Sequence, residues 1–318
     1  MATATLVLVT VFVALCGARP TPHPPADQLD HIVILRFCLP KVGKEFQEAQ
    51  CSAILTLFET TMLLSLREQN ADFRVLAYVG APMSEHLRAR LSTLLAPFPH
   101  RIVAVKEFFE PGWHDPHLEE AKVHYNAFLE GSTTNQYHTR ITTRVDVDDF
   151  MHRDALQSIQ ALHSYPRVNG VLVVNQLRGY RMTFTPGTDD PSAIQCHLSP
   201  MDYPFLAIGQ SLVTNADKKF SILDFIHDRV RFVGALVDTA GINSTDTSAI
   251  VGAFKTIPLE RGYIYVRHAL SNSQNLMEVG KDAIPCEDVA DELYQGFAIK
   301  RADVRHIASL VQRSNAAH

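Results

Sequence analysis

Ile141-Thr142-Thr143-Arg144-Val145-Asp146-Val147-Asp148-Asp149 is the stretch of this chain that decides its fold. A partly apolar segment runs directly into three carboxylates within four positions. Carboxylates this close repel one another, and each is costly to bury without a partner. A hard divalent ion such as Mg²⁺ or Mn²⁺ suits such oxygen ligands. The alternative is a solvated acidic turn in which Asp149 or a neighbour caps the helix that follows.

The first half of the chain alternates between short apolar runs and segments with helical spacing. Strands are expected at 31–37, 73–79, 101–105 and 137–145, and helices at 45–69, 84–95 (with Ser84 as N-cap), 117–129 and 153–164. This alternation predicts an α/β fold with a mainly parallel sheet covered by helices. Ligands of such sheets bind beyond the carboxyl ends of the strands, where the acidic cluster also falls.

The second half has a different pattern, which predicts a mixed arrangement. Strands are expected at 170–175 and 180–185, joined by a tight turn near Arg178-Gly179, and again at 205–213 and 264–268. A surface loop is expected at 186–200 and a helical segment at 286–313. We interpret residues 27–318 as one domain.

The N-terminal residues 1–26 differ from the rest. A mostly apolar run, Leu6 to Ala18, precedes Arg19 and a proline-rich linker, which fits a signal peptide or an uncleaved signal anchor. Entry into the secretory pathway is therefore expected, either to the lumen of the endoplasmic reticulum or Golgi or for secretion. The sequon at Asn243 agrees with this location.

Composition argues against one class of partner, and the cysteine content indicates disulfides. The chain has 318 residues, 46% of them hydrophobic, and a net charge of −5, which argues against nucleic acid as a main partner. Apart from Cys16 in the leader, four cysteines remain: Cys38, Cys51, Cys196 and Cys286. An even number in an oxidising compartment suggests disulfides, and three pairings are open. Free buried thiols are the alternative.

Four short segments, in this order, carry a resemblance to a known family. They are His31 to Phe37, Ser65 to Gln69 followed by Asp72 to Arg74, Thr143 to Asp149, and Arg267-His268. Together they resemble a rhamnosyltransferase family of the GT-A type. The resemblance implies a GT-A-like fold and a metal-dependent glycosyltransferase that moves a sugar from a nucleotide-sugar donor to a glycan or other hydroxyl acceptor. The second half would build the acceptor side.

The resemblance also assigns roles to individual residues. Asp146 would face the nucleotide ribose or the donor sugar, and Asp148 and Asp149 would hold Mn²⁺ or Mg²⁺. His268, near the end of the last expected strand, would complete the metal shell, with a structural or surface histidine as the alternative. Arg36 would lie near the nucleotide at the carboxyl end of the first strand.

Arg144 precedes the acidic cluster, and three roles are open for it. It would hold Asp148 by a bidentate pair, contact the diphosphate, or make a purely structural ion pair. No residue is selected as a catalytic base: Asp202, Asp224 and Asp238 lie in the second half, and a surface role is expected for each.

The chain departs from the GT-A pattern in one place. The second expected strand ends Tyr78-Val79-Gly80-Ala81, without the carboxylate that contacts the nucleotide base in many such enzymes, so the nucleotide is not identified. This departure gives some weight to an alternative, a non-catalytic secreted protein that binds glycans or partners on the same fold, whereas the intact Asp146, Asp148 and Asp149 count against it. Trp113 and His114 are candidates for stacking on a sugar, with half-buried core as the alternative for Trp113.

Overall fold

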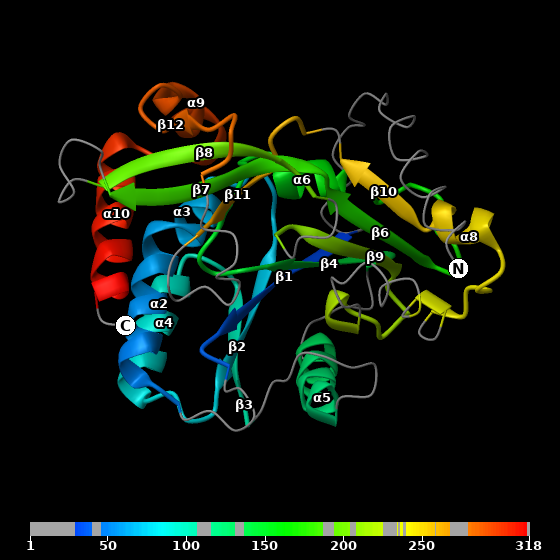
Figure 1. The fold of residues 1–318 in the computed structure, drawn as a ribbon. Coiled ribbons are helices and arrows are strands. Elements are labelled where there is room, and N and C mark those ends of the chain that lie inside the picture. Colours follow the sequence, from blue (N-terminus) through cyan, green and yellow to red (C-terminus); the bar gives the residue numbers. More distant parts are fainter. Residues whose placement is uncertain are drawn as a thin grey trace.

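A computed structural model of the chain describes residues 29–39, 46–106, 116–130, 137–186, 194–203, 208–224, 234, 236–237, 240–257, 259–267 and 279–316. The expected leader (1–26) and its Cys16 lie outside these residues, as do Trp113, His114, Asp238 and His268. In the described part, two sheets and their helices form a mixed α/β fold (Figure 1).

The larger sheet has seven strands. They are β1 (Leu29–Phe37), β2 (Arg74–Gly80), β3 (His100–Val105), β4 (Thr139–Val145), β6 (Val171–Gln176), β9 (Gln210–Asn215) and β10 (Phe254–Ile257), in the spatial order β10-β6-β9-β4-β1-β2-β3. All pairs are parallel except those of β9, which is antiparallel to β4 and β6. Every residue of β4 is buried, as a central strand covered on both faces requires.

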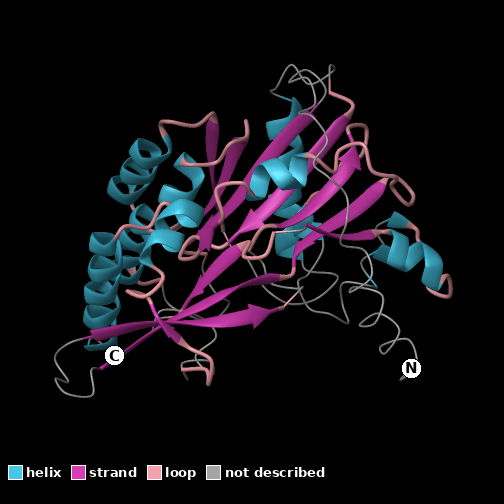
Figure 2. Ribbon diagram, turned by 90° about the horizontal axis from the view of Figure 1, so that it is seen from above, coloured by secondary structure: helices cyan, strands magenta, loops and turns pink. Residues whose placement is uncertain are grey.

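Helices cover both faces of this sheet (Figure 2). The helices α2 (Glu48–Thr60), α3 (Met62–Arg67), α4 (Glu85–Leu95) and α6 (Ala155–Gln160) pack on one face, while α5 (Pro116–Glu130), α8 (Thr247–Gly252) and the 3₁₀ turn η2 (Ile222–Asp224) pack on the other. The Ser84 side chain accepts a hydrogen bond from Leu87 N, so the expected N-cap of α4 is confirmed. The predicted sheet with helices on its faces is confirmed.

The second sheet has five strands in the order β12-β8-β7-β11-β5. They are β5 (Phe150–Met151), β7 (Arg178–Pro186), β8 (Ile194–Asp202), β11 (Tyr263–Val266) and β12 (Ile284–Pro285). Helices α9 (Ala290–Phe297) and α10 (Arg301–Ala316) complete its hydrophobic core. Helix α10 also lies beside α2, which joins this unit to the larger sheet (Figure 1).

The expected tight turn near Arg178-Gly179 is wrong. Strands β6 and β7 do not pair with each other, because β6 lies between β9 and β10 while β7 lies between β8 and β11. Only Leu177 separates them, so the chain passes from one sheet to the other within one residue. The alternation of apolar residues identifies a strand but does not identify its partner.

Two other expectations for the second half are also corrected. Residues 194–200, expected in a surface loop, belong to β8, which pairs with the whole of β7. The expected helical segment at 286–313 is two helices, interrupted at Ala298, whose φ of 60° is left-handed. A left-handed residue at this position is a common way for a helix to end.

The expected helix at 45–69 is divided into α2 and α3 at Thr61. The backbone of Thr61 leaves the helical region (φ −125°, ψ −98°), and its hydroxyl lies 2.7 Å from the carbonyl oxygen of Leu57 and 3.2 Å from that of Val147 in the acidic segment. Glu48–Arg67 is the one stretch in the described ranges that is long and apolar enough to cross a membrane, and half of it is buried inside the protein. Its packing on the sheet is that of a core helix.

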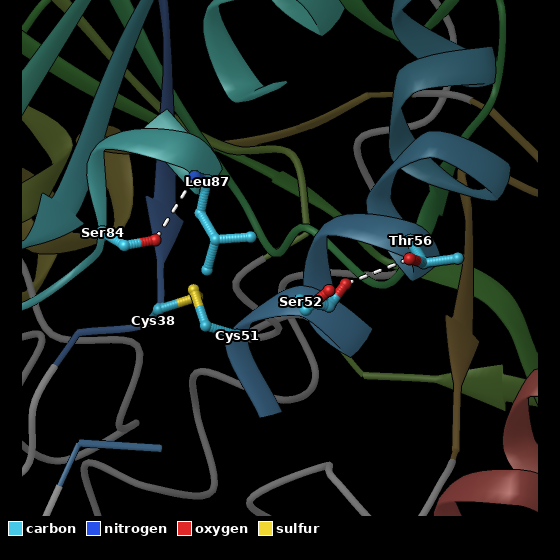
Figure 3. Close-up of a disulfide and its surroundings, with 6 residues drawn as sticks. All are labelled: Cys38, Cys51, Ser52, Thr56, Ser84 and Leu87. Carbon is cyan, nitrogen blue, oxygen red and sulfur yellow. Dashed lines mark hydrogen bonds between the residues drawn. A yellow bond between two sulfur atoms is a disulfide. The ribbon is translucent and has the colours of Figure 1, made fainter. Parts of the chain in front are cut away.

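The structure decides the cysteine pairing. Cys38 bonds to Cys51 and Cys196 to Cys286, each with 5.4 Å between the Cα atoms. The first disulfide ties the residue after β1 to the first turns of α2, close to the N-terminus of α4 (Figure 3). The second joins β8 to the residue after β12.

Candidate functional site

The acidic segment lies where the sequence predicts, directly after β4. We call residues 146–149 the acidic turn. Strands β1 and β4 are parallel neighbours, with Leu35 opposite Val145, so Arg36 and Asp146 follow at the same edge of the sheet. The Arg36 Nη2 atom is 2.8 Å from Asp146 Oδ1, and the two side chains are 14% and 32% exposed. A part-exposed carboxylate is thus held in place by a cation at the carboxyl ends of the central strands.

Asp149 is the buried member of the acidic turn. It is fully buried, and its Oδ1 accepts a hydrogen bond of 2.8 Å from Val266 N at the end of β11. Its Oδ2 is also buried and has no hydrogen-bond partner among the described residues. Burial raises the pKa of Asp149 well above its usual value, and the negative charges of Asp148 and Asp146 raise it further. A cation beside this carboxylate would relieve both effects.

Three polar side chains anchor the backbone around the acidic turn: Thr61 lies between α2 and α3, Ser65 lies on α3, and Gln69 lies two residues after α3. Thr61 donates to the carbonyl oxygen of Val147, Ser65 Oγ accepts from Met151 N (3.1 Å), and Gln69 Nε2 donates to the carbonyl oxygen of His152 (2.9 Å). The three positions are four residues apart, and all three side chains reach the same backbone stretch, 147–152. Sequence reasoning used Ser65 and Gln69 only for a resemblance, although their spacing was visible.

The opposite side of β4 is lined by buried polar residues. Arg144 is 4% exposed, pairs with Gln210 of β9, and its carbonyl oxygen accepts from Gly209 N (2.9 Å). The Gln210 amide in turn donates to the Asn175 side chain at 3.2 Å. Arg144 therefore lies buried at the end of β4, two residues before Asp146.

A second buried network runs through the sheet behind the turn. The Gln160 amide nitrogen donates to the carbonyl oxygen of Asp72 (2.8 Å) and to Nδ1 of His31 (3.1 Å). Because Nδ1 accepts, Nε2 of His31 donates to the Thr143 hydroxyl (2.7 Å), which donates to Ser211 (2.6 Å). Burial lowers the pKa of His31 from 6.5 to about 3, so the ring is neutral.

The candidate bases differ from one another. Asp202 is 69% exposed and lies 3.8 Å from Arg178, as expected for a surface residue. The surface expectation is wrong for Asp224, whose side chain is only 7% exposed and accepts from Ser221 N while pairing with Lys122. Burial raises the pKa of Asp224. Its carboxylate is engaged in holding η2 to α5.

The donor set around the acidic turn fits a hard divalent ion. Within the described ranges, no three histidine, cysteine or acidic side chains converge on one point. Ions of the Mg²⁺ type need only one or two carboxylates, because phosphate oxygens and water complete their shell. Asp149 Oδ2, buried without a hydrogen-bond partner among the described residues, and the part-exposed Asp148 would be the oxygens available to such an ion.

A separate groove of about 550 Å³ lies between α4 and strands β2 and β3. Its floor is apolar (Val79, Ile102 and Ala104), and Glu85 and Arg88 stand at its rim. None of its lining residues belongs to the acidic turn, so we do not assign it to the site.

Comparison with known proteins agrees with the motifs. The family model described as "Putative rhamnosyl transferase" matches residues 41–244. None of the curated proteins matches the chain.

Solved structures that resemble the chain have low sequence identity. A mannosyltransferase from Pyrobaculum calidifontis, in complex with GDP-Man and Mn²⁺, has 12% identity and a TM-score of 0.38, covering 86% of this chain and 66% of that one. HddC from Yersinia pseudotuberculosis has 10% identity and a TM-score of 0.37, covering 74% and 93%. Mouse xyloside xylosyltransferase 1 has 9% identity and a TM-score of 0.33, covering 72% and 85%.

The family match extends over well over half of the chain and includes the acidic turn together with Ser65, Gln69 and Arg144. The chain therefore belongs to the glycosyltransferase family described as "Putative rhamnosyl transferase".

Proposed function

We propose that the protein is a metal-dependent glycosyltransferase that moves a hexosyl or rhamnosyl-type sugar from a nucleotide-sugar donor to a hydroxyl of a glycan or another acceptor. The observation that carries the proposal is the acidic turn at the carboxyl edge of β1 and β4, with Asp149 Oδ2 buried and without a hydrogen-bond partner among the described residues. Family membership supports the same reaction class.

Each polar residue of the turn has a proposed task. Asp146, oriented by Arg36, binds the ribose or the donor sugar. Asp148 and Asp149 hold Mn²⁺ or Mg²⁺, with His268 as the further ligand that the resemblance implies. Such an ion neutralises the charge that develops on the leaving diphosphate.

Arg36 and Arg144 supply fixed positive charge beside the acidic turn. Arg144 and Arg36 lie on β4 and β1, next to the edge where the diphosphate would bind. Buried or part-buried guanidinium groups keep their charge, and they are pre-oriented by the strands that carry them. They therefore add to the electrostatic stabilisation of the nucleotide that leaves.

We also propose a location in the secretory pathway. Two disulfides between the four cysteines outside the leader fit an oxidising compartment. Asn243 of the sequon is exposed in a turn, where a glycan has room. The N-terminal segment would act as a signal peptide or would anchor the protein in the membrane.

The test is a donor panel on full-length protein made in an oxidising host. UDP-, GDP- and dTDP-sugars are incubated with and without Mn²⁺, and release of the nucleotide diphosphate is measured. We expect one nucleotide to be cleaved only with metal, and Asp148→Asn to abolish the reaction.

Asp217→Asn is the matched control, because Asp217 is exposed after β9 at the opposite edge of the sheet. Absence of metal-dependent cleavage for every donor, in a folded protein, would refute the proposal and favour the non-catalytic binding protein.

A further inference from the structure

Gln176, the last residue of β6, is a buried amide with no hydrogen-bond partner in the described part of the chain. The residue is 3% exposed, and neither Nε2 nor Oε1 makes a hydrogen bond there. A buried amide without hydrogen-bond partners lowers the stability of the folded state by about 1–3 kcal/mol. Hydrogen bonding therefore does not explain why a glutamine stands at this position. The Gln176 side chain is instead notable for its position, because its amide lies against the backbone of two different segments.

Two glycines make room for the Gln176 amide. A Cβ atom at Gly209 would overlap Nε2 of Gln176, and a Cβ atom at Gly262 would overlap Oε1. Gly209 has a φ of +70°, which favours glycine in any case. The φ of Gly262 is not in the left-handed region, so a side chain at this position would be resisted by its contact with the Gln176 amide and not by backbone strain.

The same two glycines hold the ends of the segment that carries the acidic turn. Gly209 N donates to the carbonyl oxygen of Arg144 (2.9 Å), two residues before Asp146. At the other end, His152 N donates to the carbonyl oxygen of Gly262 (3.0 Å), three residues after Asp149. One side chain thus separates the two backbone segments to which the acidic turn is attached.

We propose that Gln176 is a positioning residue that sets the geometry of the acidic turn by its bulk, as a wedge between Gly209 and Gly262. Loss of the wedge lets both glycines move inward and carries Arg144 and His152 with them. The carboxylates of the turn then leave the spacing that a divalent ion requires. This inference rests on the proposed function, because it takes the turn to be the metal site.

The experiment compares two substitutions that separate bulk from hydrogen bonding. Gln176→Ala removes the wedge, whereas Gln176→Met keeps its length and replaces the amide with apolar atoms. Mn²⁺ affinity is measured by titration calorimetry in the presence of the nucleotide diphosphate that the donor panel selects. The Mn²⁺ concentration for half-maximal donor cleavage is the second readout, since supporting residues around metal sites typically change affinity by about tenfold or more.

We expect Gln176→Ala to weaken Mn²⁺ binding about tenfold and Gln176→Met to restore it. Gln176→Met should unfold at the same temperature as the wild type or higher, because it removes two buried polar atoms that lack partners. Leu91→Ala is the matched control: Leu91 is a fully buried residue of α4 outside the acidic turn and its anchors, so stability should fall while Mn²⁺ affinity stays unchanged.

Two results would overturn the inference. Wild-type Mn²⁺ affinity in Gln176→Ala would show that the wedge does not position the turn. A loss of affinity in Gln176→Met as large as that in Gln176→Ala would show that the length of the side chain does not hold the turn, and would overturn the wedge. If instead the wild-type protein binds no Mn²⁺ with any nucleotide, the proposed metal site fails, and the role of Gln176 toward it fails as well.

Discussion

His31 makes the stability of the protein depend on pH in a calculable way. The ring is buried and neutral in the folded state, with its pKa lowered to about 3, while the unfolded chain has the ordinary value of 6.5. Between these two values the unfolded state binds a proton that the folded state does not. The contribution of His31 to the free energy of unfolding is therefore fully present above the pKa of the unfolded state. It is lost progressively as the pH falls toward the pKa of the folded state.

The size of the effect follows from the two pKa values. Each pH unit within the window changes the free energy of unfolding by about 1.4 kcal/mol. Lowering the pH to about 5, some 1.5 units below the unfolded pKa, should remove about 2 kcal/mol. Replacing the ring by a group that does not titrate, His31→Gln, should remove this part of the pH dependence.

The assay is urea unfolding at about pH 8 and about pH 5 for the wild type and the variant. For each protein, the quantity compared is the decrease in unfolding free energy from the higher to the lower pH. If the substitution itself destabilises the protein at both pH values, that effect cancels in this difference. His86→Gln is the control, because His86 is exposed on α4 and should leave the wild-type loss intact. Equal losses in the wild type and in His31→Gln would refute the buried neutral ring.

Three further predictions concern stability and are tested by thermal or urea unfolding. Ser65→Ala leaves the backbone N–H of β5 buried without its acceptor and should cost about 1–3 kcal/mol, and a cost below about 0.5 kcal/mol would contradict that anchor. Gly209→Ala should destabilise more than Gly241→Ala, because both have positive φ but Gly241 has nothing within 4 Å; equal costs would mean that the contact is not tight. Replacing the Cys38–Cys51 pair by serines should cost about 3 kcal/mol for a short loop, and an unchanged urea midpoint would show that the bond is not formed.

The central part of the fold was predictable from the sequence because it depends on local patterns. Four apolar runs separated by helical segments gave β1 to β4 and their order along the chain, and the acidic turn followed β4 as expected. Arg36 lies at the carboxyl end of β1, as expected, but its ion pair with Asp146 was not predicted, because it requires knowing that β1 and β4 are neighbours.

The second half was predicted less well because the sheet to which a strand belongs is set by partners that are mostly distant in the sequence, such as β11 for β7 and β12 for β8. Nothing in the apolar alternation of β7 and β8 shows that they leave the larger sheet, and the short strands β5 and β12 carry too few residues for a pattern. Asp224 was misjudged for a similar reason. Its partner Lys122 is far away in the sequence, so its burial was not visible.

The supporting residues of the site differ in how far they were predictable. Thr61, Ser65 and Gln69 have a spacing of four that marks a polar stripe on the helix expected at 45–69, and this signal was available. Gln176 gave no such signal. Its importance lies in contacts with Gly209 and Gly262, which only the folded chain brings together.

The passage from one sheet to the other at Leu177 limits how the length of the chain can change. Strands β6 and β7 follow each other almost without a break, and each has its own set of inward-facing residues. Inserting or deleting one residue between Val171 and Thr185 would reverse the faces of one strand and leave the other unchanged. Along this stretch a residue can be replaced by one of similar shape. A change in the number of residues would instead turn the apolar side chains of one strand away from their hydrophobic core.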